Sequence, residues 1–492
     1  MLKLAKAEAL KDQRTILGAA ATKLTMGRAR IVAILPRGEA LRNFVYSEAL
    51  DEIARSAEVT VLSVIPNGEF REILRARYPN VLPLRASEDR WVVQILREIL
   101  DMSHGRWLWS EAARERWRLR SVEAVTPAQK LKLGIKRLAC YPFANRRGLE
   151  MLSRVECVTS RWLSSADEYI QLFKELKPSL VFNSSHVHSR VAIQAVQAAR
   201  ALDIPTATFI FSWDNLTSQG RIIPPYDYYL VWSEAIKDQL LSIYSAVRPE
   251  QIFVTGTPQF DFHFRPEFYW SREEFCQKVG ADPARPIVLY STGMANHMPG
   301  ETHLVESVAA MLREMTDLGP PQLMVRVYPK DRTGRFEEVK RKLSDVLFPT
   351  VPWEPVWLTP HIEDIPLLTN TLRHCAAGIN VASTISLELC MFDKPVINIG
   401  YNPPGVATGE VDYANYYNFD HYRPVVASGA VTLAESETDV KLMLRRALVN
   451  PTMGSAQRRA LIKKMFGETL DGCSGARVAR RLVDLASRRG PI

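Results

Sequence analysis

Short apolar runs alternate with longer amphipathic stretches along most of the chain. The first run is ARIVAILP (29–36), and the stretch 40–57 after it has the spacing of a helix. Comparable apolar runs follow in the first half at 58–66, 80–85, 178–185, 205–213, 227–233 and 251–256. Strand–helix alternation of this kind is typical of a parallel sheet with right-handed crossovers, and continuous β-branched runs favour strands covered on both faces.

A second alternating block predicts a second parallel sheet. Its expected strands lie at 286–293, 322–330, 353–359, 376–383, 394–400 and 423–429. The pattern therefore predicts an α/β protein in which two Rossmann-like parallel-sheet domains face a cleft. We expect an N-terminal domain over 1–258 with a helical insertion at about 88–165, a linker over 259–285, a C-terminal domain over 286–474, and a final helix over 475–492 that packs back on the junction.

The composition is that of a globular protein. The chain has 492 residues, of which 47% are hydrophobic and 24% charged, and this excludes a disordered or collagen-like chain. No apolar run approaches the roughly 18 residues of a membrane-spanning helix, and Glu8 and Asp12 precede only a short apolar stretch, unlike a secretory signal. The six cysteines are dispersed without a CxxC pair, so neither a disulfide framework nor a zinc site is expected. These features favour a cytoplasmic protein.

The net charge of +9 is concentrated in one segment. Residues 106–147 contain eleven Lys or Arg and three Asp or Glu, a surplus of eight, together with Trp107, Trp109 and Trp117. Tryptophan beside arginine is typical of helices that lie on anionic membranes. No recognised RNA- or DNA-binding module accompanies the charge. We therefore expect an anionic membrane surface as a partner of residues 106–147, and no nucleic acid.

The strand ends contain small and hydroxyl residues but no standard cofactor fingerprint. The first strand ends in LPRGEALRNF, without a GxGxxG, and no GxxxxGK[ST] occurs, so NAD, FAD or P-loop chemistry is not expected and no cofactor is predicted. Ser291, Thr292 and Gly293 follow the first strand of the second half. A small-residue turn at such a point can direct backbone N–H groups at a phosphate.

The segment 379–401 (INVASTISLELCMFDKPVINIGY) contains the most informative spacing. A strand runs into Ser383 and Thr384, and the helix that follows carries Glu388. Hydroxyls at a helix N-terminus suit a diphosphate, and a carboxylate one turn further along can accept hydrogen bonds from ribose hydroxyls. Glu388 lies among apolar neighbours, where an idle carboxylate would be costly. This pattern indicates a nucleotide site.

The same segment resembles the nucleotide-binding signature of GT-B-fold glycosyltransferases and their relatives, the UDP-N-acetylglucosamine 2-epimerases and the CDP-glycerol glycerophosphotransferases. VTGTPQFD (254–261) is similar to their Gly-x-Pro-x-x-Asp segment, and MVRVYPKDR (324–332) is similar to the glycerophosphotransferase (Ile/Leu)-(Arg/Lys)-x-His-Pro segment, with Tyr328 in place of His. The resemblance covers roughly residues 175 to 485. It implies a GT-B-like fold, a nucleotide-sugar donor, a ribose contact for Glu388, and sugar transfer as the reaction.

The segment FSWDNLTSQGRI (211–222) predicts an acceptor site on the first half. Trp213, Asn215 and Arg221 are suited to hydroxyl-rich ligands, and similar Ser-Trp-Asp-Asn segments occur in bacterial surface-polysaccharide proteins. Asp214, His186 and Glu39 are the candidate bases for the attacking hydroxyl. Sequence alone does not choose among these three.

Arg326 and Lys330 stand at one strand end near the predicted diphosphate site. Positive charge there would stabilise a departing nucleoside diphosphate. No DxD motif stands at a strand end, and His186 and His188 have no third ligand spaced to join them, so no metal is expected.

Taken with these patterns, the resemblance to GT-B glycosyltransferases implies a metal-independent glycosyltransferase. It would move a sugar from a nucleotide-activated donor to a growing surface glycan or a lipid-linked acceptor. A nucleotide-sugar 2-epimerase and a CDP-polyol phosphotransferase remain the alternatives of the same fold.

Overall fold

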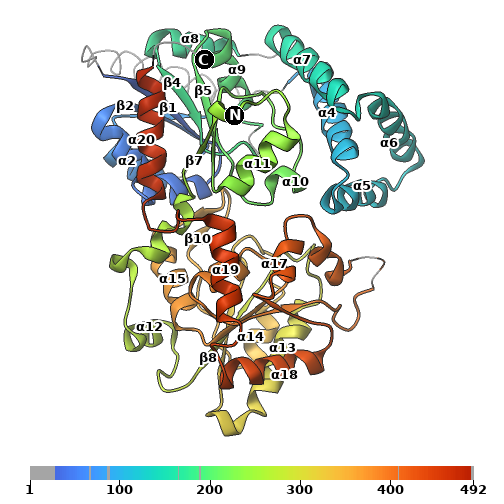
Figure 1. Cartoon of the computed structure of the whole chain (residues 1–492), viewed down its shortest axis with the longest axis vertical. Coiled ribbons are helices and arrows are strands. Elements are labelled where there is room, and N and C mark those ends of the chain that lie inside the picture. Colours follow the sequence, from blue (N-terminus) through green and yellow to red (C-terminus); the bar gives the residue numbers. More distant parts are fainter. Residues whose placement is uncertain are drawn as a thin grey trace, which may run out of the picture.

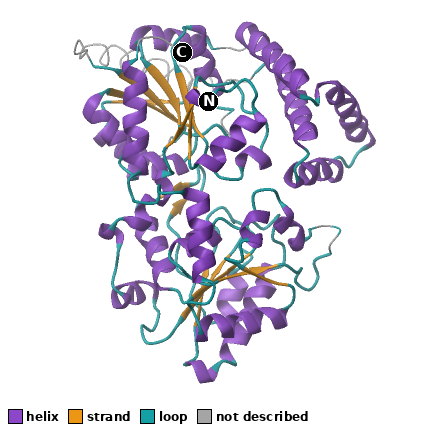
Figure 2. Cartoon of the chain, in the orientation of Figure 1, coloured by secondary structure: helices purple, strands orange, loops and turns teal. Residues whose placement is uncertain are grey.

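A computed structural model of the chain describes residues 28–65, 68–85, 89–163, 166–187, 190–407, 409 and 411–488. Two parallel sheets follow one another along the long axis, each with helices on both sides, and a group of helices stands beside the first sheet (Figures 1 and 2). The predicted α/β architecture with two parallel sheets is confirmed. The N-terminal segment in which no secretory signal was expected lies outside the described residues.

The first sheet has seven parallel strands in the order β3-β2-β1-β4-β5-β6-β7. The strands are β1 Arg30–Leu35, β2 Glu58–Ser63, β3 Asn80–Pro83, β4 Leu180–Asn183, β5 Thr206–Phe209, β6 Tyr228–Val231 and β7 Ile252–Val254. β1 pairs with β2 from Arg30 opposite Glu58 and with β4 from Ile31 opposite Leu180. The strand order reverses between β1 and β4, and open α/β sheets bind ligands at the carboxyl ends of strands beside such a point.

The second sheet has five parallel strands in the order β14-β13-β12-β8-β9. The strands are β8 Ile287–Ser291, β9 Gln322–Arg326, β12 Ala377–Asn380, β13 Val396–Ile399 and β14 Thr432–Ala434. A separate antiparallel pair, β10 Trp353–Glu354 and β11 Thr359–Pro360, forms a short hairpin. Here the order reverses between β8 and β12, so the second sheet offers the same kind of ligand position.

The other helices of the two halves lie between the strands or follow the last one. In the first half they are α2 Ala49–Ser56, α3 Gly68–Arg77, α8 Asp167–Leu176, α9 Ile193–Ala201, α10 Asn215–Ser218 and α11 Glu234–Ile243. In the second half they are α12 Arg272–Val279, α13 Glu301–Arg313, α14 Glu337–Lys342, α15 Asp364–His374, α16 Ile385–Met391, α17 Arg423–Ala427, α18 Glu437–Val449 and α19 Ser455–Phe466.

The last helix, α20 (Ser474–Ser487), packs against α2, β1 and β4 of the first half. Asp261 accepts hydrogen bonds from the backbone N–H groups of Ser474 and Gly475 at 3.0 and 2.7 Å. The segment that leads into the second half therefore caps the helix that returns from it. The residue numbers proposed for the domain boundaries stay a prediction.

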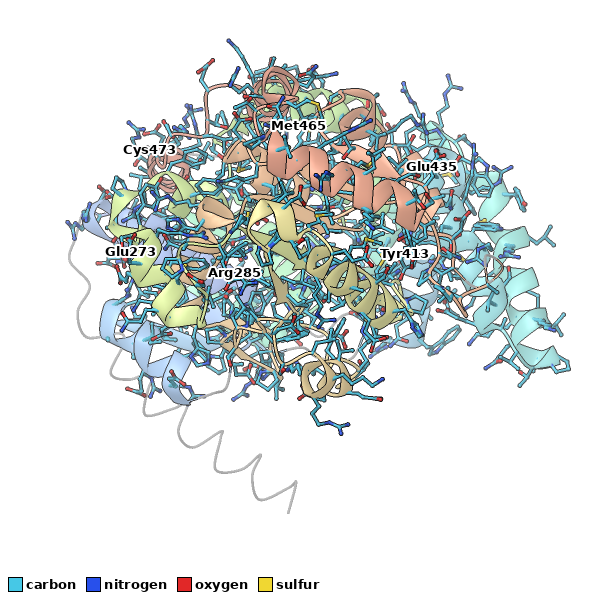
Figure 3. The ribbon with its side chains drawn as sticks, turned by 90° about the horizontal axis from the view of Figure 1, so that it is seen from below. Glu273, Arg285, Tyr413, Glu435, Met465 and Cys473 are labelled. Carbon is cyan, nitrogen blue, oxygen red and sulfur yellow. The ribbon has the colours of Figure 1, made fainter. Side chains whose placement is uncertain are left out.

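The insertion consists of four helices, α4 Trp91–Leu108, α5 Glu111–Glu123, α6 Pro127–Cys140 and α7 Arg146–Leu163. It stands to one side of the two sheets in both views of the molecule (Figures 1 and 3). Trp107, Trp109 and Trp117 are half-buried, and Arg106 lies over the ring of Trp109 and Arg137 over the ring of Trp117. Among the described residues, no helix is long and apolar enough to cross a membrane.

Three expected elements differ from the structure. The helix expected over 40–57 is interrupted: a π-helix, Leu41–Tyr46, precedes α2, and Glu48 between them has a left-handed φ of 65°. The strand expected over 353–359 is the β10–β11 hairpin. The strand expected over 423–429 is helix α17, because Pro424 stands in its first turn, where proline suits a helix, and the sheet strand is β14 further along.

His104 in α4 gives the insertion a pH-dependent stability. Its ring is fully buried, and neither ring nitrogen has a hydrogen-bond partner. Burial, with smaller contributions from Arg221 and Arg116, lowers the pKa of His104 to about 3. The folded state therefore binds fewer protons than the unfolded state, so the stability from this residue is full above the unfolded pKa of about 6.5 and falls as the pH drops toward 3.

We expect His104→Phe to flatten this dependence. Phenylalanine keeps a ring beside Trp107 and Tyr244, whose centroids lie 5.9 Å from that of His104, and it removes the titration. When the pH falls from 8 to 5, the parent protein should lose about 2 kcal/mol more unfolding free energy than the variant, which is the gain expected for the variant. Thermal unfolding at both pH values measures the difference. His303→Phe on the exposed surface of α13 should show no such gain; an equal gain in both variants would contradict the assignment to His104.

Candidate active site in the cleft between the two sheets

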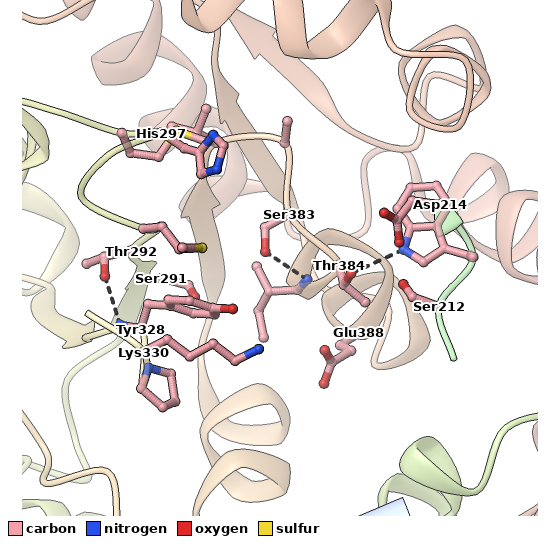
Figure 4. Close-up of a pocket in the computed structure, with 18 of the residues that line it drawn as sticks. Ser212, Asp214, Ser291, Thr292, His297, Tyr328, Lys330, Ser383, Thr384 and Glu388 are labelled. Carbon is pink, nitrogen blue, oxygen red and sulfur yellow. Dashed lines mark hydrogen bonds between the residues drawn. The ribbon is translucent and has the colours of Figure 1, made fainter. Parts of the chain in front are cut away.

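A cavity of about 920 Å³ lies between the carboxyl ends of the two sheets. This volume is within the range that drug-sized and nucleotide-sized ligands occupy. Both halves and the insertion line it, and the predicted residues among the lining are Glu39, Trp213, Asp214, Ser291, Thr292, Gly293, Arg326, Lys330, Ser383, Thr384 and Glu388. Figure 4 shows Lys330 and Glu388 pointing into the same space from opposite sides. Asn215, Arg221 and His186 do not line it.

The wall formed by β12 and α16 holds the hydroxyls predicted to bind phosphate. Ser383 and Thr384 lie in the turn between these elements, after Ala382 with its left-handed φ of 35°. The Ser383 amide donates to Asn380 Oδ1 at 3.2 Å. Beneath the turn, Asn380 Oδ1 also accepts from Ser386 Oγ at 3.0 Å and from Asn398 Nδ2 at 3.1 Å. These bonds to one buried amide oxygen fix the turn before any ligand arrives.

Glu388 is held by a histidine that the sequence interpretation missed. The Glu388 Oε2 atom lies 3.0 Å from Nε2 of His263, and His263 Nδ1 lies 3.1 Å from Thr369 Oγ1. His263 is buried in the 3-10 helix Pro258–Phe264. The other carboxylate oxygen of Glu388 has no partner among the described residues, which leaves it for a ligand. His263 lies two residues after Asp261, the last residue of the Gly-x-Pro-x-x-Asp segment, and this proximity was the one hint in the sequence. Its contact with Glu388, 125 residues further along the chain, has no sequence pattern.

The two cations predicted to balance a leaving group are both already paired. Arg326 Nη2 donates to Asp364 Oδ1 and Oδ2 at 2.7 and 2.9 Å, and this pair is buried. Lys330 Nζ lies 2.6 Å from Glu39 Oε1, an interaction that joins the two halves across the cleft. Arg326 thus has its charge satisfied within the second half, whereas the half-buried Lys330 still borders the open space.

Glu39 lines the cavity but fits the role of a base poorly. Burial alone would raise the pKa of its carboxyl, but Lys330 and Arg37 outweigh burial and hold the pKa below its ordinary value. Arg37 donates to both carboxylate oxygens at 2.8 and 3.0 Å. A carboxylate that already binds two cations is a weak proton acceptor. Its geometry is that of an anchor for Lys330.

The turn at 291–293 does not offer its backbone amides as the sequence predicted. The Thr292 amide donates to the Arg326 carbonyl at 3.1 Å, and the Gly293 amide donates to both carboxylate oxygens of Glu301 at 2.9 and 3.1 Å. Glu301 is fully buried at the start of α13, and burial raises its pKa to about 7 despite the nearby Arg335. The expectation that these two amides point at a phosphate is therefore corrected. The Ser291 side chain remains on the cavity wall.

The predicted acceptor segment divides between the cavity and the packing around it. Trp213 is buried, and its Nε1 donates to Thr384 Oγ1 at 3.1 Å across the cleft. Asp214 lines the cavity, and its Oδ2 accepts from Ser218 Oγ at 2.6 Å. Asp214 is thus the candidate base on this wall that the structure places against the open space.

The remaining predicted residues of the first half make structural contacts. Asn215 Oδ1 accepts from the Ser212 amide at 2.9 Å within the turn before α10. Arg221 donates to Ser153 Oγ of α7 at 2.9 Å, so its guanidinium reaches into the insertion and away from the acceptor position predicted for it. His186 Nδ1 lies 3.3 Å from the carbonyl oxygen of Phe209, outside the cavity lining.

A second histidine in the lining, His421, lies beside the predicted acceptor wall. Its ring packs edge-on against Trp213 with the centroids 5.0 Å apart. Burial lowers the pKa of His421, while the Asp214 and Asp420 carboxylates act in the opposite direction. Its Nδ1 atom is buried without a hydrogen-bond partner. A neutral imidazole in this position can accept a proton, and the irregular segment around it gave no sequence signal.

The insertion also forms part of the site. Ala112, Glu115, Arg116, Leu119 and Glu123 of α5 line the cavity. The Glu111 amide donates to Asp420 Oδ2 at 2.9 Å, so α5 also contacts the second half.

Among the described residues, no group of three or more His, Cys, Asp or Glu could hold a metal ion.

The closed contact between the halves depends on Gly38. Its amide donates to the Trp357 carbonyl of the β10–β11 hairpin at 3.2 Å. A Cβ atom on Gly38 would lie 2.5 Å from that carbonyl oxygen and 2.7 Å from Thr359 Cα. Only glycine permits this approach, which places Glu39 within reach of Lys330.

We expect Gly38→Ala to displace the hairpin from the first half. Overlap with backbone atoms should cost about 1–3 kcal/mol or open the cleft, so hydrogen exchange over 353–360 should accelerate. Gly68→Ala is the matched control, since a Cβ there meets nothing within 4 Å. Equal exchange rates in the two variants would show that this contact does not hold the halves together.

No protein-family model matches the sequence, and no curated protein sequence matches it. Among solved structures, UDP-GlcNAc 2-epimerase from Neisseria meningitidis bound to UDP-GlcNAc aligns with a TM-score of 0.51 at 11% identity, over 93% of this chain and all of the other. The S. aureus MnaA–UDP co-structure aligns with a TM-score of 0.50 at 12% identity, over 90% and 94% of the two chains. The chain is therefore an α/β protein with a GT-B-type fold, as the sequence resemblance implied.

Proposed function

We propose that the protein is a glycosyltransferase that uses a nucleotide-sugar donor bound in the cleft. The observation that carries this proposal is the convergence on one cavity of Ser383, Thr384 and Glu388 from the second half with Asp214 from the first. In the proposed complex, Ser383 contacts the diphosphate and the free oxygen of Glu388 accepts from the ribose hydroxyls. Thr384 contributes only if a ligand shares or displaces its bond with Trp213.

The acceptor hydroxyl would approach from the wall that carries Asp214 and His421. One of these groups takes the proton as the hydroxyl oxygen bonds to the anomeric carbon, and the bond from that carbon to the diphosphate oxygen breaks. The nucleoside diphosphate leaves with the electron pair, and the Lys330 ammonium, anchored by Glu39, stabilises its charge. No step in this scheme requires a metal ion.

The acceptor in this proposal is a growing surface glycan or a lipid-linked glycan at an anionic membrane. The contribution of α5 to the cavity supports a large acceptor, because this helix adds a wall beyond the two sheets. An enzyme that only rearranges its nucleotide sugar needs no second substrate and gains nothing from such a wall.

A nucleotide-sugar 2-epimerase is the second candidate. It is favoured by the likeness of the whole fold to UDP-GlcNAc 2-epimerases, one of them bound to UDP-GlcNAc. The two candidates differ in whether an acceptor is consumed.

Following a panel of nucleotide sugars by NMR, with and without lipid-extract acceptors, separates the candidates. A transferase should release nucleoside diphosphate in an acceptor-dependent manner and keep the donor's configuration at C2. Conversion of the donor to its 2-epimer without acceptor would replace the proposal by the epimerase. Release of a nucleoside monophosphate from a CDP-polyol would identify a phosphotransferase instead.

A further inference from the structure

Helix α7 presents a row of apolar side chains to solvent. Met151, Val155, Val158 and Trp162 are 53%, 44%, 59% and 81% exposed. Their spacing of four, three and four residues places them on one face of the helix. Isolated exposed apolar residues are ordinary on protein surfaces, but four on one face form an unpartnered stripe.

The contacts of α7 show that this stripe faces away from the rest of the molecule. Leu149 and Leu152 pack with Leu100 of α4, and Glu156 accepts from Arg97 of α4 at 2.7 Å. Another face meets the first half, where Arg146 donates to the Ser242 carbonyl at 3.2 Å and Ser153 accepts from Arg221. The apolar stripe belongs to neither face. In Figure 1, α7 lies at the upper edge of the insertion.

A row of cations flanks the apolar stripe. Arg147, Arg154 and Arg161 recur every seven residues, so they share one side of the helix, and all three are exposed. None forms a salt bridge with a described residue, in contrast to Arg97 in the neighbouring α4, which is paired with Asp89 and Glu156. An apolar stripe bordered by unpaired arginines has the chemistry of a helix that lies in the interface of an anionic membrane.

We propose that α7 is the face on which the protein rests on an anionic lipid surface. This assignment moves the expected contact away from the tryptophans at 107, 109 and 117, which are half-buried within the insertion. The four apolar side chains would enter the headgroup region, and the three arginines would bind lipid phosphates. The same insertion supplies α5 to the cavity wall, so membrane binding would hold the cavity beside its lipid-linked acceptor; that last consequence rests on the proposed function.

Flotation of the full-length protein with vesicles tests this proposal. The protein should bind vesicles of phosphatidylcholine with phosphatidylglycerol more tightly than vesicles of phosphatidylcholine alone, and raising the salt from about 0.1 to about 1 M should weaken the difference. At roughly fivefold for each cation, replacing Arg147, Arg154 and Arg161 together by glutamine should lower binding to anionic vesicles on the order of 100-fold. The matched control replaces the exposed Arg341, Lys464 and Arg480 by glutamine and should retain binding.

A second variant tests the apolar stripe separately. Val158→Ser with Trp162→Ser should lower vesicle binding by about tenfold or more at either salt concentration. Both side chains are exposed, so the fold should be retained, and Val449→Ser on α18, with 63% exposure, is the control.

The proposal would be overturned if the parent protein did not bind anionic vesicles or if the control triple variant lost binding equally. A stable dimer that the Val158/Trp162 variant converts to monomers, without any vesicle binding, would also overturn it. Nucleic-acid binding that depends on the three arginines, without vesicle binding, would overturn it as well. Thermal shift with nucleotides on the same variants separates this proposal from the proposed function. Vesicle binding without nucleotide binding would support the membrane contact of α7 and contradict the proposed glycosyltransferase function.

Discussion

Glu388→Ala is expected to weaken nucleotide binding on the order of 100-fold. A ribose that donates two hydrogen bonds to a carboxylate gains roughly 1.5–3 kcal/mol from each charged hydrogen bond in favourable cases. The carboxylate is pre-positioned by His263 at 3.0 Å, so little side-chain entropy is lost when a ligand binds. Titration calorimetry with the nucleotide that stabilises the parent protein measures the change.

Two further variants support this test. Glu338→Ala on the surface of α14 is the control for loss of a glutamate and should bind nucleotide normally. His263→Phe should give a smaller loss, about tenfold, because the carboxylate remains but is no longer held by the imidazole. Unchanged affinity in Glu388→Ala would show that the helix α16 carboxylate is not the ribose contact.

Arg326→Met is expected to act mainly on stability. It leaves Asp364 buried with Trp353 Nε1, at 2.7 Å, as its remaining side-chain partner. Removing one partner of a buried ion pair typically costs about 3–5 kcal/mol. This corresponds to a fall in the unfolding midpoint of roughly 10 °C for a unit the size of the second half, which differential scanning fluorimetry can detect.

The double variant Arg326→Met with Asp364→Asn isolates the ion pair. Removing both charges should recover part of the lost stability, because no unpaired carboxylate remains. Lys330→Met, by contrast, should lower the midpoint less, since Glu39 keeps Arg37 as a partner. If Arg326→Met kept its midpoint and lost nucleotide affinity instead, the original prediction of a ligand contact for Arg326 would hold.

Most strands of both sheets were predictable because each is a short apolar run between polar turns. The errors arose where local pattern and tertiary packing disagree. Residues 423–429 have the apolar character of a strand, but Pro424 suits a first helical turn. Residues 353–359 form the edges of a hairpin whose tip reaches Gly38, more than 300 residues earlier in the chain.

Residues from both sides of the cleft were predicted to line the site, but only the second half has a compact local signature for it. Ser383, Thr384 and Glu388 have a local signature because a strand end, a turn and a helix place them together. The bonds from His263 to Glu388, from Trp213 to Thr384 and from Glu39 to Lys330 join segments at least 125 residues apart. No sequence pattern linked the two residues of any of these pairs.

Nucleotide binding in the cleft through the second half underlies the proposed function. Thermal-shift titration of the full-length protein with UDP, GDP, CDP, CMP and ADP, without added metal, tests it most directly. Selective binding stabilises the folded state by about 2.7 kcal/mol at a hundredfold excess over Kd. We expect a clear shift with one of these nucleotides in the parent protein and its loss in Glu388→Ala. No shift with any of the five, or an equal shift in Glu388→Ala, would contradict it.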